Sequence, residues 1–111
     1  MDLQSMVIEY FKKQDYTIEL NPVLTDSYGR KYEFDLIARH GDVTNVVFIR
    51  DWNRKLHIGT FRKMLERSNA VNLDPIVICS GGFSDFIIDY SKKENVMIIP
   101  MDNIRRFLEV H

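Results

Sequence analysis

The sequence predicts an α/β domain, and three patterns in it support this class. Apolar residues recur at helical spacing near the amino terminus, and short alternating or wholly apolar runs typical of strands follow. The run Val46-Val47-Phe48-Ile49 is apolar without alternation, which favours a central strand covered on both faces. Over 111 residues the elements follow the order α-β-β-β-α-β-α-β-α, which fits a single domain spanning 1–111.

The first half of the chain is predicted to hold one helix and three strands. Helical spacing covers residues 2–14, with Asp2 as the N-cap. A strand over 16–20 is ended by Asn21-Pro22, and a turn is expected at 27–30. Two further strands, 31–39 and 44–51, are joined by a hairpin turn at 40–42.

The second half alternates helices with strands. A helix is expected over 57–71, a strand over 76–79, a helix over 84–93 and a strand over 96–99. A terminal helix then begins with Asp102 as its N-cap. The side chains expected to face inward are Ile58, Phe61, Met64 and Leu65 on the first of these helices, Phe86, Ile87 and Tyr90 on the next, and Ile104, Phe107 and Leu108 on the last.

Composition limits the possible functions. The formal net charge is −1, so no overall basic field attracts nucleic acid, and DNA binding needs a local patch. The single cysteine, Cys79, excludes an internal disulfide and lies in an apolar run that predicts a buried thiol. No apolar run approaches the roughly 20 residues of a membrane span, and the first residues lack a signal peptide's features. We therefore expect a cytoplasmic protein without membrane contact.

Two neighbouring strands carry a motif. Asp35 lies in the strand Tyr32–Ala38, and Val47-Phe48-Ile49-Arg50-Asp51-Trp52 ends the next. This pairing resembles the PD-(D/E)xK nuclease superfamily, especially its Mrr-like and archaeal Holliday-junction-resolvase-like branches, where an Asp faces a Glu-x-Lys. The later segments Ser80–Ser84 and Val96–Ile99 also resemble the Mrr-like branch. The resemblance, over roughly residues 3–108, implies a restriction-endonuclease-like αβββαβ core: a central mixed sheet flanked by helices, with an extra strand and a C-terminal helix.

The chain departs from the motif at the two positions that carry the chemistry. Phe48 stands in place of the Glu and offers no metal ligand, and Arg50 stands in place of the Lys. An arginine cannot act as a base near neutral pH, whereas beside Asp35 it forms a salt bridge that repels a cation. The vestigial site therefore predicts neither metal binding nor catalysis, and no cofactor is expected. His40, His57 and His111 show no metal-ligand spacing either.

Two carboxylates could restore a metal site. Glu33 precedes Asp35 by two residues, which predicts the same strand face, and Glu9 resembles the helix-borne Glu of some resolvases. Mg²⁺ or Mn²⁺ would bind only in that active-nuclease alternative. Solvent-exposed positions are the simpler interpretation of both residues.

A basic cluster surrounds the end of the central strand and the following helix. It consists of Arg50, Arg54, Lys55, Arg62, Lys63 and Arg67, with Trp52 interleaved. Such a patch could bind phosphates while Trp52 stacks on a base or sugar, although a solvated helix face explains it equally well. The Ser80-Gly81-Gly82 segment before a helix could bind an anion, but a plain strand-to-helix connection is favoured.

Three functions therefore remain open at this point. The favoured one is a catalytically degenerate nuclease-fold protein that serves as a non-catalytic DNA-binding or assembly subunit in DNA processing. The second is an active metal-dependent DNA endonuclease with a migrated carboxylate. The third is a protein-interaction scaffold without DNA affinity, recognisable by an exposed apolar patch. A homodimer is expected from the resemblance alone.

Overall fold

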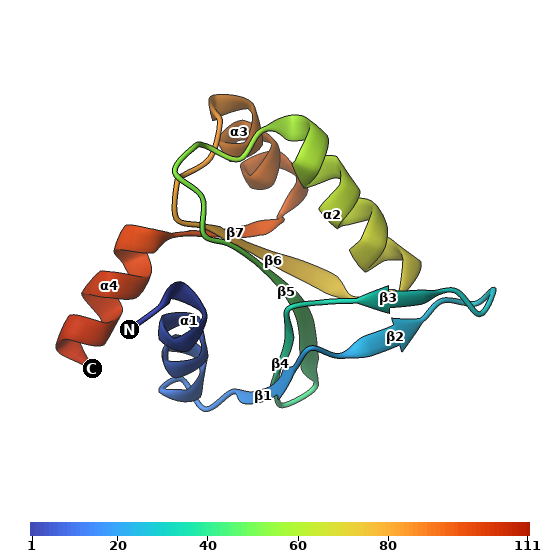
Figure 1. Ribbon diagram of the computed structural model, residues 1–111, viewed down its shortest axis with the longest axis horizontal. Helices are drawn as coiled ribbons and strands as arrows, with labels where there is room; N and C mark the ends of the chain where they lie inside the picture. Colours follow the sequence, from blue (N-terminus) through green and yellow to red (C-terminus); the bar gives the residue numbers. More distant parts are fainter.

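A five-stranded sheet with two helices on each face forms the centre of the molecule (Figure 1). The computed structural model describes all residues from 1 to 111. The strand order in the sheet is β1-β4-β5-β6-β7, and β2 and β3 form a separate two-stranded ribbon. The elements are α1 Leu3–Lys12, β1 Thr17–Leu20, β2 Val23–Thr25, β3 Lys31–Glu33, β4 Leu36–His40, β5 Val43–Arg50, α2 Ile58–Ala70, β6 Asp74–Cys79, α3 Asp85–Glu94, β7 Met97–Pro100 and α4 Met101–Val110.

The sheet is mixed, and β5 lies at its centre. Strands β1, β4 and β5 are antiparallel neighbours, whereas β5, β6 and β7 run parallel. Along β5, Val46 and Phe48 contribute to the core on one face, while Val47 is buried on the other. The run Val46–Ile49 is therefore the two-sided central strand that its lack of alternation predicted.

Helices α1 and α4 cover one face of the sheet. Leu3, Val7 and Phe11 of α1 and Ile104 of α4 are buried there against Val47 and its neighbours. Burying each such side chain contributes roughly 1.5–3 kcal/mol. Asp2 is the N-cap as predicted, since its Oδ1 accepts a hydrogen bond of 2.7 Å from Ser5 N. This bond lowers the pKa of the Asp2 carboxyl below its ordinary value.

Helices α2 and α3 cover the other face. Phe61 and Met64 of α2 and Ile87 of α3 are buried, and so is the free thiol of Cys79. The prediction that Phe86 faces inward is wrong, because this side chain is 56% exposed. The buried positions of α3, Ile87 and Ser91, are one helical turn apart and leave Phe86 beside that stripe.

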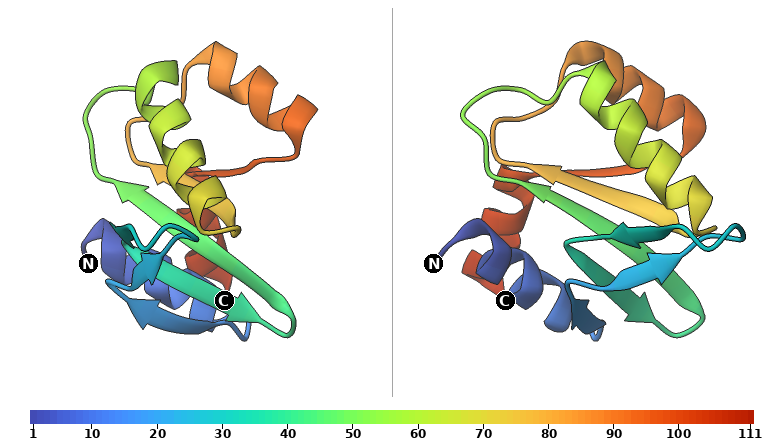
Figure 2. Two further views of the ribbon diagram at one scale, coloured as in Figure 1. Left: turned by 90° about the vertical axis from the view of Figure 1, so that its right-hand side faces the viewer. Right: turned by 45° about the vertical axis from the view of Figure 1, so that its right-hand side comes forward.

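The predicted strand over 31–39 is broken, and a hairpin was missed. Asn21 adopts a φ of 49°, which turns the chain out of β1, and β2 then forms where no strand was predicted. Strand β3 pairs with β2 and not with the main sheet. The chain, which left the main sheet after β1, returns to it at Leu36, where β4 begins. The hairpin leaves the sheet on the side of α2 (Figure 2). Residues 34 and 35 therefore form a junction between two sheets.

The tip of this hairpin is closed by Asp26. Its Oδ1 accepts hydrogen bonds of 2.9 Å from Tyr28 N and from Arg30 N, and its Oδ2 accepts one of 3.2 Å from the Tyr32 hydroxyl. Desolvation alone would raise the pKa of Asp26, but these hydrogen bonds outweigh it and lower the pKa below its ordinary value. The Asp26 carboxylate therefore stabilises the turn between β2 and β3.

The last helix begins earlier than predicted. Its N-cap is Pro100, not Asp102, and Met101 is already helical and buried. A proline has no backbone N–H to donate. Its absence does not weaken the helix at this position, because the first N–H groups of a helix have no partner within the helix. None of the helices has the length and apolar character needed to cross a membrane.

Candidate functional site

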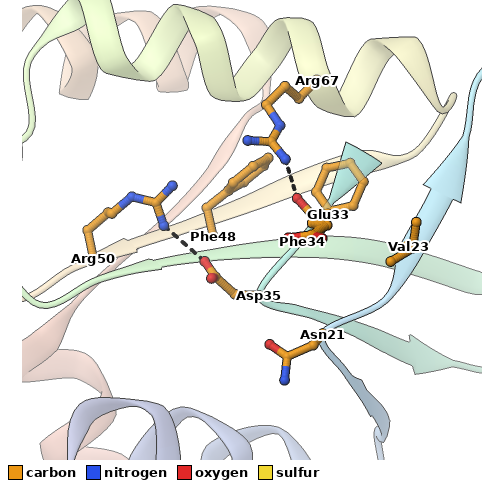
Figure 3. Close-up of a pocket in the computed structure, with 8 residues that line it drawn as sticks. All are labelled: Asn21, Val23, Glu33, Phe34, Asp35, Phe48, Arg50 and Arg67. Atoms are coloured by element: carbon orange, nitrogen blue, oxygen red, sulfur yellow. Dashed lines mark hydrogen bonds and ion pairs between the residues drawn. The ribbon is translucent and has the colours of Figure 1, made fainter. Parts of the chain in front are cut away.

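A pocket of about 360 Å³ lies where the β2–β3 hairpin, the end of β5 and helix α2 meet (Figure 3). The residues of the sequence motif are part of its wall. Its lining consists of Asn21, Val23, Glu33, Phe34, Asp35, Phe48, Arg50 and Arg67. Polar and charged groups therefore come from four separate segments of the chain.

The Asp35 carboxylate is bound within the protein. Its Oδ2 accepts a hydrogen bond of 2.7 Å from Ile49 N and one of 3.0 Å from Arg50 Nη1, so the predicted ion pair forms. Arg50 Nη1 also donates to the Ile49 carbonyl oxygen at 2.9 Å. The Asp35 side chain is 39% exposed and that of Arg50 is 28% exposed, so solvent weakens this attraction. The break between β3 and β4 is what allows Asp35 to reach across to β5.

Phe48 forms the floor of the pocket beside this pair. It is 2% exposed and packs edge-on against Phe34, with ring centroids 5.7 Å apart. It supplies no oxygen where the family motif has a carboxylate. A divalent ion that prefers hard oxygen ligands would find the Asp35 carboxylate already bonded to a guanidinium and no carboxylate at position 48. These residues do not fit a metal ion, and no group of three or more His, Cys, Asp or Glu side chains in the protein is arranged to hold one.

The two possible replacement carboxylates lie in different places. Glu33 lines the pocket with Asp35, but it belongs to β3 and the prediction that both share one strand face is wrong, because the strand breaks between them. Glu9 lines a separate groove between α1 and α4, where its carboxylate lies 3.8 Å from Lys13 Nζ. The structure therefore brings Glu33, and not Glu9, to the vestigial site.

Acidic residues on the other side of Asp35 are also engaged. A smaller hollow of about 260 Å³ is lined by Asp2, Asp35 and Asp51, among others. Asp2 caps α1, and Asp51 Oδ1 accepts a hydrogen bond of 2.8 Å from Ser80 Oγ. These carboxylates serve local structure.

Arg67 also lines the pocket, where the sequence had indicated only a member of the basic cluster. Its guanidinium carbon lies 5.4 Å from the centre of the Phe34 ring, and its Nη2 donates to the carbonyl oxygen of Glu33. Its Nε is the single buried side-chain nitrogen or oxygen without a hydrogen-bond partner. Arg67 follows buried Met64 by three residues, which places it beside the apolar stripe of α2, and this spacing was the available signal.

The remaining basic residues face solvent. Arg54 and Lys55 lie in the loop between β5 and α2, and Arg62 and Lys63 lie on α2. The Arg54 guanidinium stands 4.3 Å from the centre of the half-buried Trp52 ring. None of these four charges is in an ion pair. The ion pairs of the protein are Glu9–Lys13, Glu19–Arg39, Asp35–Arg50 and Asp102–Arg105.

The loop that carries Arg54 and Lys55 is fixed to the loop before α3. Leu56 N donates to Gly82 O at 2.9 Å, and Ser84 N donates to Leu56 O at 3.0 Å. A side chain at Gly81 would overlap the Arg54 carbonyl oxygen, which explains the glycine. Ser80 N donates to Arg50 O and Gly82 N donates to Cys79 O, so these two N–H groups are bonded within the protein, as in a plain strand-to-helix connection.

These observations define the class of protein: a mixed α/β fold with a five-stranded sheet flanked by helices and a pocket at the junction of its two sheets. No family model and no curated protein matches the chain. Two solved structures share the fold. A protein of unknown function called AF1548 matches with a TM-score of 0.79 at 13% identity, covering 87% of this chain and 55% of its own. The protein VC1899 from Vibrio cholerae matches with a TM-score of 0.66 at 10% identity, covering 94% of this chain and 30% of its own.

Proposed function

We propose that this chain is a restriction-endonuclease-like domain with a degenerate active site, which works as a non-catalytic DNA-binding or assembly subunit in DNA processing. One observation carries the proposal. Asp35, the remaining motif carboxylate, is bonded to Arg50 and to a backbone N–H, and buried Phe48 takes the place of the second carboxylate. This arrangement stabilises the fold and repels a cation.

The order of the elements supports the nuclease-type assignment. Helix α1 is followed by the antiparallel strands β1, β4 and β5, then by α2 and the parallel strand β6. This is the αβββαβ order that the sequence resemblance implies, with the hairpin β2–β3 as an insertion. Strand β7 and helix α4 then supply the extra strand and the C-terminal helix.

The DNA-binding part of the proposal rests on unpaired positive charge. Arg54, Lys55, Arg62 and Lys63 are exposed, close together in the sequence, and in none of the four ion pairs of the protein. We call these four residues the basic face. Exposed cations without partners bind backbone phosphates and release counterions, a driving force that a formal net charge of −1 does not prevent.

The active-nuclease alternative has less support. Glu33 and Asp35 are the carboxylates in the pocket, and Arg50 and Arg67 line the same space. Two guanidinium groups there oppose the binding of Mg²⁺ or Mn²⁺. This alternative predicts metal-dependent cleavage that Glu33→Gln abolishes.

An assembly role has one candidate surface. Strand β7 is an edge of the sheet, and an apolar groove lined by Phe83, Ile88, Val96, Met97 and Ile98 runs beside it. Unpaired backbone groups at such an edge could accept a second β7 strand. Homodimerisation stays a prediction, which sedimentation velocity can decide.

The proposed function is tested by fluorescence anisotropy with labelled linear, forked and four-way-junction DNA, over a salt series without divalent metal. Wild-type protein should bind, with an affinity that falls as salt rises. Neutralising the basic face (Arg54→Gln, Lys55→Gln, Arg62→Gln and Lys63→Gln together) should reduce the slope of log K against log[salt] by up to about 4. The matched control neutralises four exposed charges elsewhere, at Lys12, Lys92, Lys93 and Arg106, and should keep the slope.

Two results would contradict this function. Absence of binding to every DNA at low salt would remove nucleic acid from it and favour the scaffold alternative. Cleavage that requires Mg²⁺ and is lost in Asp35→Asn would show that the site is still catalytic.

A further inference from the structure

We propose that the pocket binds one phosphate group of a nucleic-acid strand between Arg50 and Arg67, where a nuclease would hold a metal ion. This inference rests on the proposed function and extends it from the exposed basic face to the vestigial site. The two arginines come from β5 and α2 and line the same pocket (Figure 3). In that view their guanidinium groups lie on either side of Phe48.

Arg50 has unused hydrogen-bond donors. Both of its hydrogen bonds, to Asp35 Oδ2 and to Ile49 O, come from Nη1. Its Nε and Nη2 have no partner in the protein. The ion pair therefore fixes the guanidinium in place and leaves further N–H groups for a ligand, which is how an arginine fork recognises a phosphate.

Arg67 is held in place in a similar way. Its Nη2 donates to Glu33 O and its guanidinium lies against the Phe34 ring, while Nε is buried without a partner and Nη1 makes no hydrogen bond. Because Nε is enclosed by protein atoms and Nη2 is already bonded, the donor that Arg67 has left for an anion is Nη1, and the positive charge of the guanidinium adds to its attraction. Two guanidinium groups whose donors are unused and whose orientation is fixed favour an anion with several oxygens.

The charges in the pocket predict opposite effects of a single substitution, Glu33→Gln, on a phosphate site and on a metal site. Asp35 is already compensated by Arg50, whereas the exposed side chain of Glu33 has no ion-pair partner. Glu33 therefore repels an anion in the pocket, and Glu33→Gln should strengthen phosphate binding. A metal site built on Glu33 requires the reverse, because the same substitution would remove a ligand.

The first experiment follows the Arg67 Nε–H signal of ¹⁵N-labelled protein during titration with inorganic phosphate at constant ionic strength. The signal is assigned by its disappearance in Arg67→Gln. We expect a saturable shift that sodium chloride does not produce, and tighter saturation in Glu33→Gln. No saturable shift, or the same shift with chloride, would overturn the inference.

The second experiment compares oligonucleotides with and without a terminal 5′-phosphate by anisotropy. Tighter binding of the phosphorylated strand identifies a terminal phosphate, and equal binding identifies an internal one. In either case Arg67→Gln should lower the salt slope by about 1, and Lys92→Gln on α3 should leave it unchanged. An unchanged slope in Arg67→Gln would overturn the inference even where the basic face still binds DNA.

The two proposals fail in different ways. DNA binding that depends on the basic face but not on Arg67 retains the function and removes the phosphate pocket. A phosphate-induced shift in a protein that binds no DNA retains an anion site in the pocket, but it removes both the function and the assignment of that anion to a nucleic-acid strand.

Discussion

Two carboxylate–arginine pairs link neighbouring segments at the main sheet, one between β1 and β4 and one between β5 and the residue that precedes β4, and they differ in their surroundings. Glu19 and Arg39 link β1 to β4 with 3.2 Å between Oε1 and Nη1, and their side chains are 50% and 45% exposed. Asp35 and Arg50 are separated by 3.0 Å and are 39% and 28% exposed. Only Asp35 also accepts a backbone N–H, from Ile49 at 2.7 Å. Distance alone therefore does not distinguish the two pairs. We call Asp35–Arg50 the inner pair and Glu19–Arg39 the outer pair.

The lower exposure of the Asp35–Arg50 pair and the additional backbone hydrogen bond of Asp35 show how an ion pair can contribute more to stability than a surface contact does. Exposed pairs typically contribute about 0.2–1 kcal/mol, because water screens them and two long side chains must be ordered. Hydrogen bonds to charged groups contribute roughly 1.5–3 kcal/mol when they are shielded. Asp35 is short, lies at a junction of two sheets and contacts the backbone of the central strand, so we expect its pair to approach the lower end of that range.

The largest expected change in stability comes from truncating Phe48, which lies in the same pocket as the inner pair. Phe48→Ala should reduce the free energy of unfolding by about 3–5 kcal/mol, because it leaves a cavity beside Phe34 and opens the pair to water. Urea denaturation followed by circular dichroism measures this change. Phe86→Ala, on an exposed phenylalanine, is the control and should change stability by about 0.5 kcal/mol or less. Equal losses in both variants would contradict the burial described for Phe48.

A smaller effect is expected when the inner pair is broken. Arg50→Gln should destabilise the protein by about 1–2 kcal/mol, because Asp35 keeps its backbone bond but loses its counter-charge. A double-mutant cycle with Asp35→Asn, measured by urea denaturation, should give a coupling energy of about 1 kcal/mol or more. Additive losses would mean that the pair contributes nothing beyond its separate side chains.

The smallest effect is expected at the outer pair. The same cycle with Glu19→Gln and Arg39→Gln should give a coupling energy of about 0.2–1 kcal/mol that disappears as salt is raised. Thermal unfolding at low and high ionic strength measures it. A coupling that matches the inner pair and resists salt would remove the distinction between them.

The sequence predicted the inner pair and the central strand but not the shape of the site around them. The unbroken apolar run Val46–Ile49 indicated burial on both faces, and a family resemblance pointed to Asp35 and Arg50 as partners. The hairpin was missed because its cause is local: Asn21 adopts a left-handed conformation that a single sequence does not reveal. Arg67 was counted only among the basic residues, since its contacts depend on where that hairpin folds.

The mutual packing of the two loops beside the site restricts how this chain can vary. Leu56 is bonded to Gly82 and Ser84 by its backbone, and Gly81 lies against the Arg54 carbonyl with no room for a side chain. An insertion or deletion in either loop would shift these contacts out of alignment. Loops usually tolerate changes of length, but here a change in one requires a compensating change in the other. We therefore expect the length of the segment between β5 and α2 to be coupled to the length of the segment between β6 and α3.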